Sequence, residues 1–177
     1  GEYKHLQHLA AKIQQNKSLG YTLRQIRKKR THSNQEIAAE AKKLYDILGA
    51  HVEQRMAAAA ELKKTDPFRA HKEYSEIAET FTGDKIGILA RKEARALSTH
   101  PTVKSEKNAR HIWKQIQFYS ARLSPYKGKQ DPASPGFRKQ NAKAIVTLVR
   151  QCRKLIRQYP DTSVVPAAKS FIQRYTE

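Results

Sequence analysis

Two histidines near the amino-terminal end have a spacing that could support metal binding. His5 and His8 are three residues apart, so a helix would place both imidazoles on one face. A zinc site needs three or four ligands, and neither histidine is followed by a further His, Cys or carboxylate at a spacing typical of metal motifs. The pair therefore predicts no metal site, and no motif in the chain would hold a cofactor.

Motifs that would indicate catalysis are also missing. The chain has no Gly-rich phosphate-binding loop and no Gly-x-Ser-x-Gly nucleophile elbow. Glu73, Glu76 and Glu79 recur along one predicted helix beside Lys72, which is typical of a solvated helix surface. We therefore expect a protein that is not an enzyme.

Cys152 is the only cysteine, so no disulfide can form within the chain. It falls on the apolar side of the helix predicted over 137–159. A cysteine in that position is typically buried and unreactive, because an apolar environment disfavours the thiolate.

The charge of the chain points to anionic partners. It has 35 basic and 16 acidic residues and a net charge of +19. Nucleic acid, phospholipid surfaces, acidic polysaccharides and acidic proteins would all be attracted, and charge alone does not choose among them. The alternative is a Lys-rich surface that is merely solvated.

The helix predicted over 137–159 provides the clearest candidate surface for such a partner. Its apolar side runs from Phe137 through Leu148 and Cys152 to Tyr159, and basic residues occupy the other side. No acid occurs between Phe137 and Pro160, so these charges have no partner along the helix. The candidate residues for binding an anionic partner are Arg138, Lys143, Arg150, Arg153, Lys154 and Arg157.

Two alternatives apply to this basic surface. Glu73, Glu76 or Glu79 could lie across from it and neutralise it, which would make the surface structural. The basic cluster at Arg24–Arg30 is denser, but it lies in a segment with less regular patterning. Nucleic acid has only weak support as the partner, because the aromatic residues are not interleaved with the basic runs.

The apolar residues recur at intervals of three and four along most of the chain, which predicts an all-α fold of about seven helices in antiparallel hairpins. Ser33 to Glu36 form a capping box that begins the longest periodic segment, to about Lys64. A hairpin follows over 66–98, with Asp66 as the cap of its first helix and Asp84 as the cap of its second. No run of 18 apolar residues occurs, so we expect no transmembrane segment.

A second hairpin, over 142–176, repeats the pattern of the first with an offset of 78 residues. Tyr74 then corresponds to Cys152, Ile77 to Leu155, and Phe81 to Tyr159. Each copy is a helix that ends at an aromatic residue, a short turn, and a second helix with small residues. Between the two copies, Ser124 to Gly136 contain three prolines and two glycines, which predicts a loop.

These hairpins resemble the tetratricopeptide-type α-α repeat. The run of Ala70, Tyr74, Ile77, Ala78 and Phe81 resembles the second helix of that repeat. Residues 159–168 resemble the turn and following helix in bacterial envelope proteins of the same type. The offset of 78 differs from the usual 34, and the Trp-x-x-Leu-Gly signature is missing.

This resemblance implies a helical-repeat interaction or scaffold module with a protein partner, and an irregular helical bundle or α-α superhelix as its architecture. We expect a single helical domain over 1–177, with 1–32 as a peripheral helical segment. Because the chain begins with Gly1, we also expect a longer protein, for which a periplasmic or secreted location is favoured over a cytoplasmic one. The alternative function is a polyanion- or nucleic-acid-binding protein that uses the basic helix surface.

Overall fold

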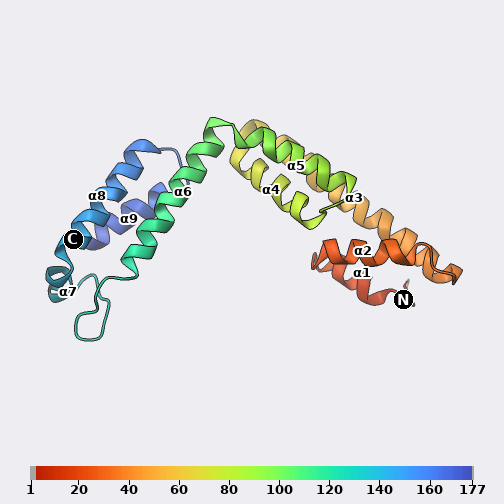
Figure 1. Ribbon diagram of the computed structural model, residues 1–177, viewed down its shortest axis with the longest axis horizontal. Coiled ribbons are helices and arrows are strands. Elements are labelled where there is room, and N and C mark those ends of the chain that lie inside the picture. Colours follow the sequence, from red (N-terminus) through yellow and green to blue (C-terminus); the bar gives the residue numbers. More distant parts are fainter. Residues whose placement is uncertain (1–2, 177) are drawn as a thin grey trace. The chain divides into compact units, whose positions relative to one another are not determined.

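The computed structural model describes residues 3–176, and these form nine helices without a β-strand (Figure 1). The all-α prediction is therefore confirmed. The helices are α1 (Gln7–Gln14), α2 (Leu19–Lys29), α3 (Gln35–Thr65), α4 (Pro67–Thr80), α5 (Lys85–Ser98), α6 (Pro101–Ser120), α7 (Pro135–Gln140), α8 (Ala142–Gln158) and α9 (Val165–Thr176).

The contacts within the chain divide it into two compact units, Gly1–His100 and Pro101–Glu177. The first unit contains α1 to α5 and the second contains α6 to α9. The sequence predicts a single domain, which requires the two units to unfold together. This stays a prediction.

The core of the first unit forms along the buried side of α3. Leu44, Leu48 and Val52 of that helix are almost completely buried and pack in one cluster with Ile77 of α4. The amino-terminal segment, expected at the periphery, contributes Ile26 and several leucines to the same cluster. Glu40 of α3 also accepts hydrogen bonds from the backbone N–H groups of residues 4–6, which anchors the chain just before α1.

The helix caps agree with the sequence at one position and differ at two. Asp66 accepts a hydrogen bond from the Arg69 N–H at 2.9 Å, as predicted. The cap of α3 is Asn34 rather than Ser33, because the Asn34 side chain accepts from the first free N–H groups of the helix. Asp84 precedes α5 but does not cap it with its side chain, since its carboxylate pairs with Arg27 of α2.

The two predicted hairpins are present with the predicted offset. Helices α4 and α5 end at Thr80 and Ser98, and α8 and α9 end 78 residues later, at Gln158 and Thr176. Equivalent positions are buried in both copies, as for Ile77 and Leu155. The turn of the first copy contains Gly83 with a φ of +86°, a conformation that glycine adopts at little cost.

The second unit has its own core between α6, α8 and α9. Ile116 of α6, Cys152 and Leu155 of α8 and Ala168 of α9 are inaccessible to solvent. The helix predicted over 137–159 is divided at Asn141, which accounts for one of the helices beyond the expected seven or so. Within residues 3–176, no helix is both long enough and apolar enough to cross a bilayer.

The irregular segment between α6 and α7 is held by side chains on both sides. The Asn141 amide accepts from the Ser124 N–H and donates to the Ser124 carbonyl, each at 2.9 Å. Gln130 donates to the carbonyl of Leu123 at 2.6 Å, and Tyr126 forms an isolated bridge with Lys129. These contacts fix the path by which the chain leaves α6 and enters α7.

Candidate functional site

A buried carboxylate sets the position of α6 in the second unit. Glu106 is 5% exposed, and its two oxygens accept from the backbone N–H and the hydroxyl of Ser163. Arg110, one turn further along α6, donates to the same carboxylate at 2.7 Å. Burial raises the pKa of Glu106, but the hydrogen bonds from Ser163 and Arg110 together outweigh it and leave the pKa below its ordinary value.

The predicted basic surface is present on α8. Lys143, Arg150, Arg153, Lys154 and Arg157 are exposed there, and none of them has an acidic partner among residues 3–176. We call these five residues the α8 cations. Apart from the adjacent Arg153 and Lys154, their separations of three, four and seven residues place them on one side of the helix, because an α-helix repeats every 3.6 residues.

Arg138, the sixth predicted residue, has a different environment. It lies on α7 and is half-buried. Its guanidinium donates to the backbone carbonyl of Pro132 at 2.7 Å and to that of Ala133 at 3.4 Å. Arg138 therefore holds the segment before α7, and it belongs to a different helix from the α8 cations.

The acids considered as partners for the basic surface have contacts of their own in the first unit. Glu73 lies 2.6 Å from Arg55 of α3, and Glu76 lies 3.6 Å from Arg55 and 3.7 Å from Lys72. Glu79 has no ion pair in the part of the chain that the structure describes. Glu73 and Glu76 therefore form their ion pairs with Arg55 and Lys72, and neither pairs with an α8 cation.

Positive charge is concentrated in the second unit. Residues 101–177 contain sixteen Lys and Arg against four Asp and Glu, while residues 1–100 contain nineteen against twelve. Glu106 is one of those four acids, and its carboxylate already accepts hydrogen bonds from Arg110 and Ser163. The α8 cations therefore lie in a unit that has few acids to neutralise them, which raises the local attraction for anions.

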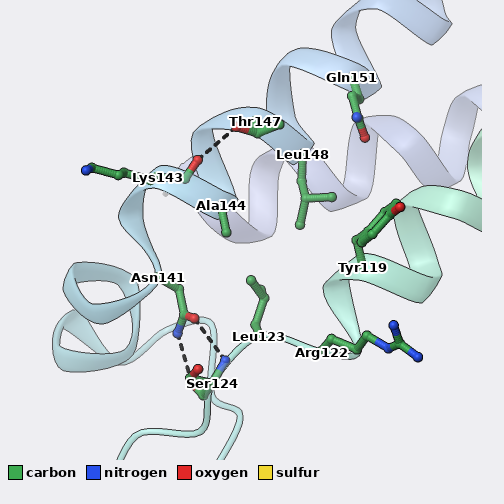
Figure 2. Close-up of a pocket in the computed structure, with 10 residues that line it drawn as sticks. All are labelled: Tyr119, Arg122, Leu123, Ser124, Asn141, Lys143, Ala144, Thr147, Leu148 and Gln151. Atoms are coloured by element: carbon green, nitrogen blue, oxygen red, sulfur yellow. Dashed lines mark hydrogen bonds between the residues drawn. The ribbon is translucent and has the colours of Figure 1, made fainter.

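A groove of about 650 Å³ opens between α6 and α8 (Figure 2). Figure 2 shows Tyr119 of α6 and Leu148 of α8 on facing sides of it, while Lys143 and Arg122 extend outwards on opposite sides. The residues that line the groove are Tyr119, Arg122, Leu123, Ser124, Asn141, Lys143, Ala144, Thr147, Leu148 and Gln151.

The sequence did not predict this groove. Tyr119 lies one turn after the buried Ile116 on the apolar stripe of α6, yet it is 55% exposed. Phe118 is 51% exposed and meets Tyr119 edge-on at 5.5 Å between ring centroids. Two adjacent aromatic residues at the end of a helix, just before a Pro- and Gly-rich segment, were the available signal.

The other reactive side chains form no site in the described part of the chain. His5 lies 3.1 Å from Glu36, and no three His, Cys, Asp or Glu residues within 3–176 are grouped to hold a metal ion. Cys152 is inaccessible, as predicted, and burial raises the pKa of its thiol to about 11. A thiol with that pKa is almost fully protonated at neutral pH and reacts slowly.

The arrangement of paired antiparallel helices, repeated with a fixed offset and followed by short turns, defines an α-helical repeat protein. The comparison with protein families agrees with this class. The family model described as "Epg5-like, TPR repeats" matches residues 3–175, and the chain belongs to that family. The resemblance to tetratricopeptide-type repeats is thereby confirmed, whereas the bacterial envelope type is not. No curated protein and no solved structure matches the chain.

Proposed function

We propose that this chain is a protein-interaction or scaffold module that acts by binding rather than by catalysis. Membership in a TPR repeat family supports the proposal, because helical repeats expose extended surfaces that bind other proteins. The observation that carries it is the α6–α8 groove, an open apolar depression with an exposed aromatic residue next to a row of unpaired cations. Exposed apolar patches of this kind mark interaction sites.

The experiment uses the whole chain, 1–177, immobilised and incubated with a native extract treated with nuclease. Proteins that stay bound at moderate salt are then purified and titrated with the free chain by calorimetry. A saturable 1:1 complex with a purified protein would support the proposal. If only polyanions are retained and no purified protein binds, the chain is not a protein-interaction module.

Polyanion binding is the second candidate function, and the α8 cations favour it. They project from one side of a helix whose apolar side is already buried. A polyanion that binds there would therefore contact mainly charged side chains. The test measures affinity for duplex DNA, single-stranded RNA and heparin at several salt concentrations. Release of counterions predicts that affinity falls steeply with salt, by a logarithmic slope of about 0.9 for each phosphate contacted. A flat salt dependence would rule this function out.

A further inference from the structure

We propose that the groove between α6 and α8 binds an acidic peptide segment of a partner protein through one large apolar side chain. This proposal names the partner class for the interaction module proposed above and rests on it. Three features carry it: the exposed aromatic wall of the groove, the cations at its edges, and the hydrogen bonds that engage Asn141 and Thr147 within the protein.

The apolar wall of the groove is formed by Tyr119 and Leu148. Tyr119 is more than half exposed although it continues the apolar stripe of α6, and Leu148 on the facing helix is 4% exposed. Leu123, which follows α6, also lines the groove, and Figure 2 shows it below Leu148 and near Ala144. A volume of about 650 Å³ can receive one large side chain together with the backbone that carries it. Burial of that side chain would remove the exposed face of Tyr119 from water, which favours association.

Positive charge borders the groove on both sides. Arg122 follows Tyr119 by three residues, and its guanidinium lies over the Phe118 ring, 3.8 Å from the ring centroid. That stacking holds the guanidinium at the edge of the groove. Lys143 occupies the opposite side, and neither cation has an acidic partner among residues 3–176. A peptide with acids on both sides of its apolar side chain is complementary to this arrangement.

Two polar side chains of the groove favour a peptide over a nucleic acid. Asn141 uses its oxygen on the Ser124 N–H and its nitrogen on the carbonyls of Ser124 and Phe137. The Thr147 hydroxyl donates to the Lys143 carbonyl at 3.0 Å. The Asn141 and Thr147 side chains are therefore engaged within the protein and have little left to bind the edge of a base. An apolar side chain needs no such partner.

A membrane surface fits the geometry less well than a peptide. The apolar side of α8 packs into the core of the second unit through Ile145, Leu148 and Leu155, so it cannot enter a bilayer. Val146 is the one large apolar residue of α8 that is more than half exposed, and it lies among the α8 cations. A single valine gives little insertion energy.

The test is a selection of random 16-residue peptides displayed on messenger RNA against the immobilised chain, 1–177. The enriched peptides are then synthesised with a fluorescent label and titrated by polarisation. We expect them to be acidic and to share one Leu, Phe, Trp or Met, whose replacement by Ser lowers affinity by about 30-fold, as for an interface hot spot.

Two tryptophan variants locate the site. Ala144→Trp places an indole in the groove, whereas Ala142→Trp places it on an exposed position of the same helix outside the groove. Ala144→Trp should weaken the selected peptides by about 30-fold or more, and Ala142→Trp should leave them unchanged. Because any Ala144→Trp protein that fails to fold gives no information, Tyr119→Ala serves as the second variant. Tyr119 is exposed, so its removal should lower affinity while the helical circular dichroism and melting temperature stay constant.

The outcomes separate this proposal from the more general one. Enrichment of acidic, singly apolar peptides that Ala144→Trp and Tyr119→Ala weaken supports both. Peptides that bind the variants and the unmodified chain equally overturn the groove as the site and leave the interaction module standing. Enrichment of basic or charge-free peptides overturns the acidic partner. A selection that enriches no peptide overturns the peptide groove, and the native-extract experiment then decides the interaction module separately. If single-stranded RNA or anionic vesicles bind and no protein does, polyanion binding takes the place of both.

Discussion

The Glu106 carboxylate of α6 accepts a hydrogen bond from the backbone N–H of Ser163 at 2.9 Å, across 57 residues of sequence. Ser163 lies in the turn between α8 and α9, so this contact fixes α6 to the second hairpin. The same carboxylate also holds Arg110 and the Ser163 hydroxyl, and it is almost fully buried. One ionised side chain therefore adds to the apolar core in placing the first helix of the second unit.

Replacement of Glu106 by Gln should destabilise the second unit. The amide keeps the shape of the side chain but loses the charge-assisted hydrogen bonds, and it presents an NH₂ donor where two acceptors are needed. We expect the free energy of unfolding to fall by about 1–3 kcal/mol. Urea denaturation followed by the fluorescence of Trp113, the only tryptophan, measures this. Asp161→Asn is the matched control, because Asp161 is an exposed acid of the same unit without a bonded partner, and it should have no effect.

The same carboxylate predicts how stability depends on pH. The hydrogen bonds hold the pKa of Glu106 below its ordinary value of about 4.3 despite the burial that raises it. A lowered pKa in the folded state means that the contribution is fully present above the unfolded pKa and is lost as pH falls through the folded pKa. The unmodified protein should therefore lose stability below about pH 4, and Glu106→Gln should lose less over the same range. Parallel pH curves for the two proteins would contradict this assignment.

Two glycines inside helices should respond to alanine in opposite ways. A Cβ at Gly87, in the first turn of α5, would overlap the backbone carbonyl of Phe81, so Gly87→Ala should cost about 1–3 kcal/mol. A Cβ at Gly49, in the middle of α3, would meet nothing within 4 Å, so Gly49→Ala should stabilise by about 0.5–1 kcal/mol through helix propensity. Thermal melting of the two variants measures both signs. Equal effects would show that the close approach at Gly87 does not govern stability.

What the sequence could predict depended on the range of the interaction. The stripe through Tyr74 and Ile77, and its equivalent at Cys152 and Leu155, follows from helical periodicity, which is a local property. The partner of Asp84 could not be found in the same way, because Arg27 lies 57 residues away and is brought close only by the packing of α2. The sequence therefore predicted a helix cap for the Asp84 side chain, which instead forms an ion pair with Arg27.

The groove was missed for a related reason. The pattern of α6 shows which side of the helix is apolar, but it does not show how much of that side a neighbouring helix covers. At Ile116 the stripe is fully buried, and one turn later, at Tyr119, it is exposed. The position of α8 determines at which residue the apolar side of α6 ceases to be buried. The basic side of α8 was predictable because it has no acid within its own sequence, whereas the bond from Arg138 to the Pro132 carbonyl depends on the path of the preceding segment.

The two units should unfold together if residues 1–177 form the single domain expected from the sequence. Trp113 lies in α6, with its ring edge-on to Phe171 of α9 at 6.1 Å, so its fluorescence reports on the second unit. Far-ultraviolet circular dichroism reports on the helices of both units. We expect the two signals to give the same urea midpoint. Separate midpoints would show two domains, with the boundary at His100 and Pro101.

The last prediction concerns the α8 cations and uses charge reversal of Arg150, Arg153 and Arg157. All three are exposed and have no acidic partner in the described chain, so their replacement by Glu breaks no ion pair. Heparin affinity at low salt should fall by on the order of tenfold or more, and the dependence of affinity on salt should become shallower, because fewer counterions are released. The melting temperature should barely move, since exposed charges of this kind contribute little to stability.

Reversal of Lys42, Lys43 and Lys92, three exposed and unpaired cations of the first unit, changes the net charge equally and serves as the control. An equal loss of affinity in that control would show attraction by net charge alone, and a lower melting temperature with unchanged affinity would make the α8 surface structural.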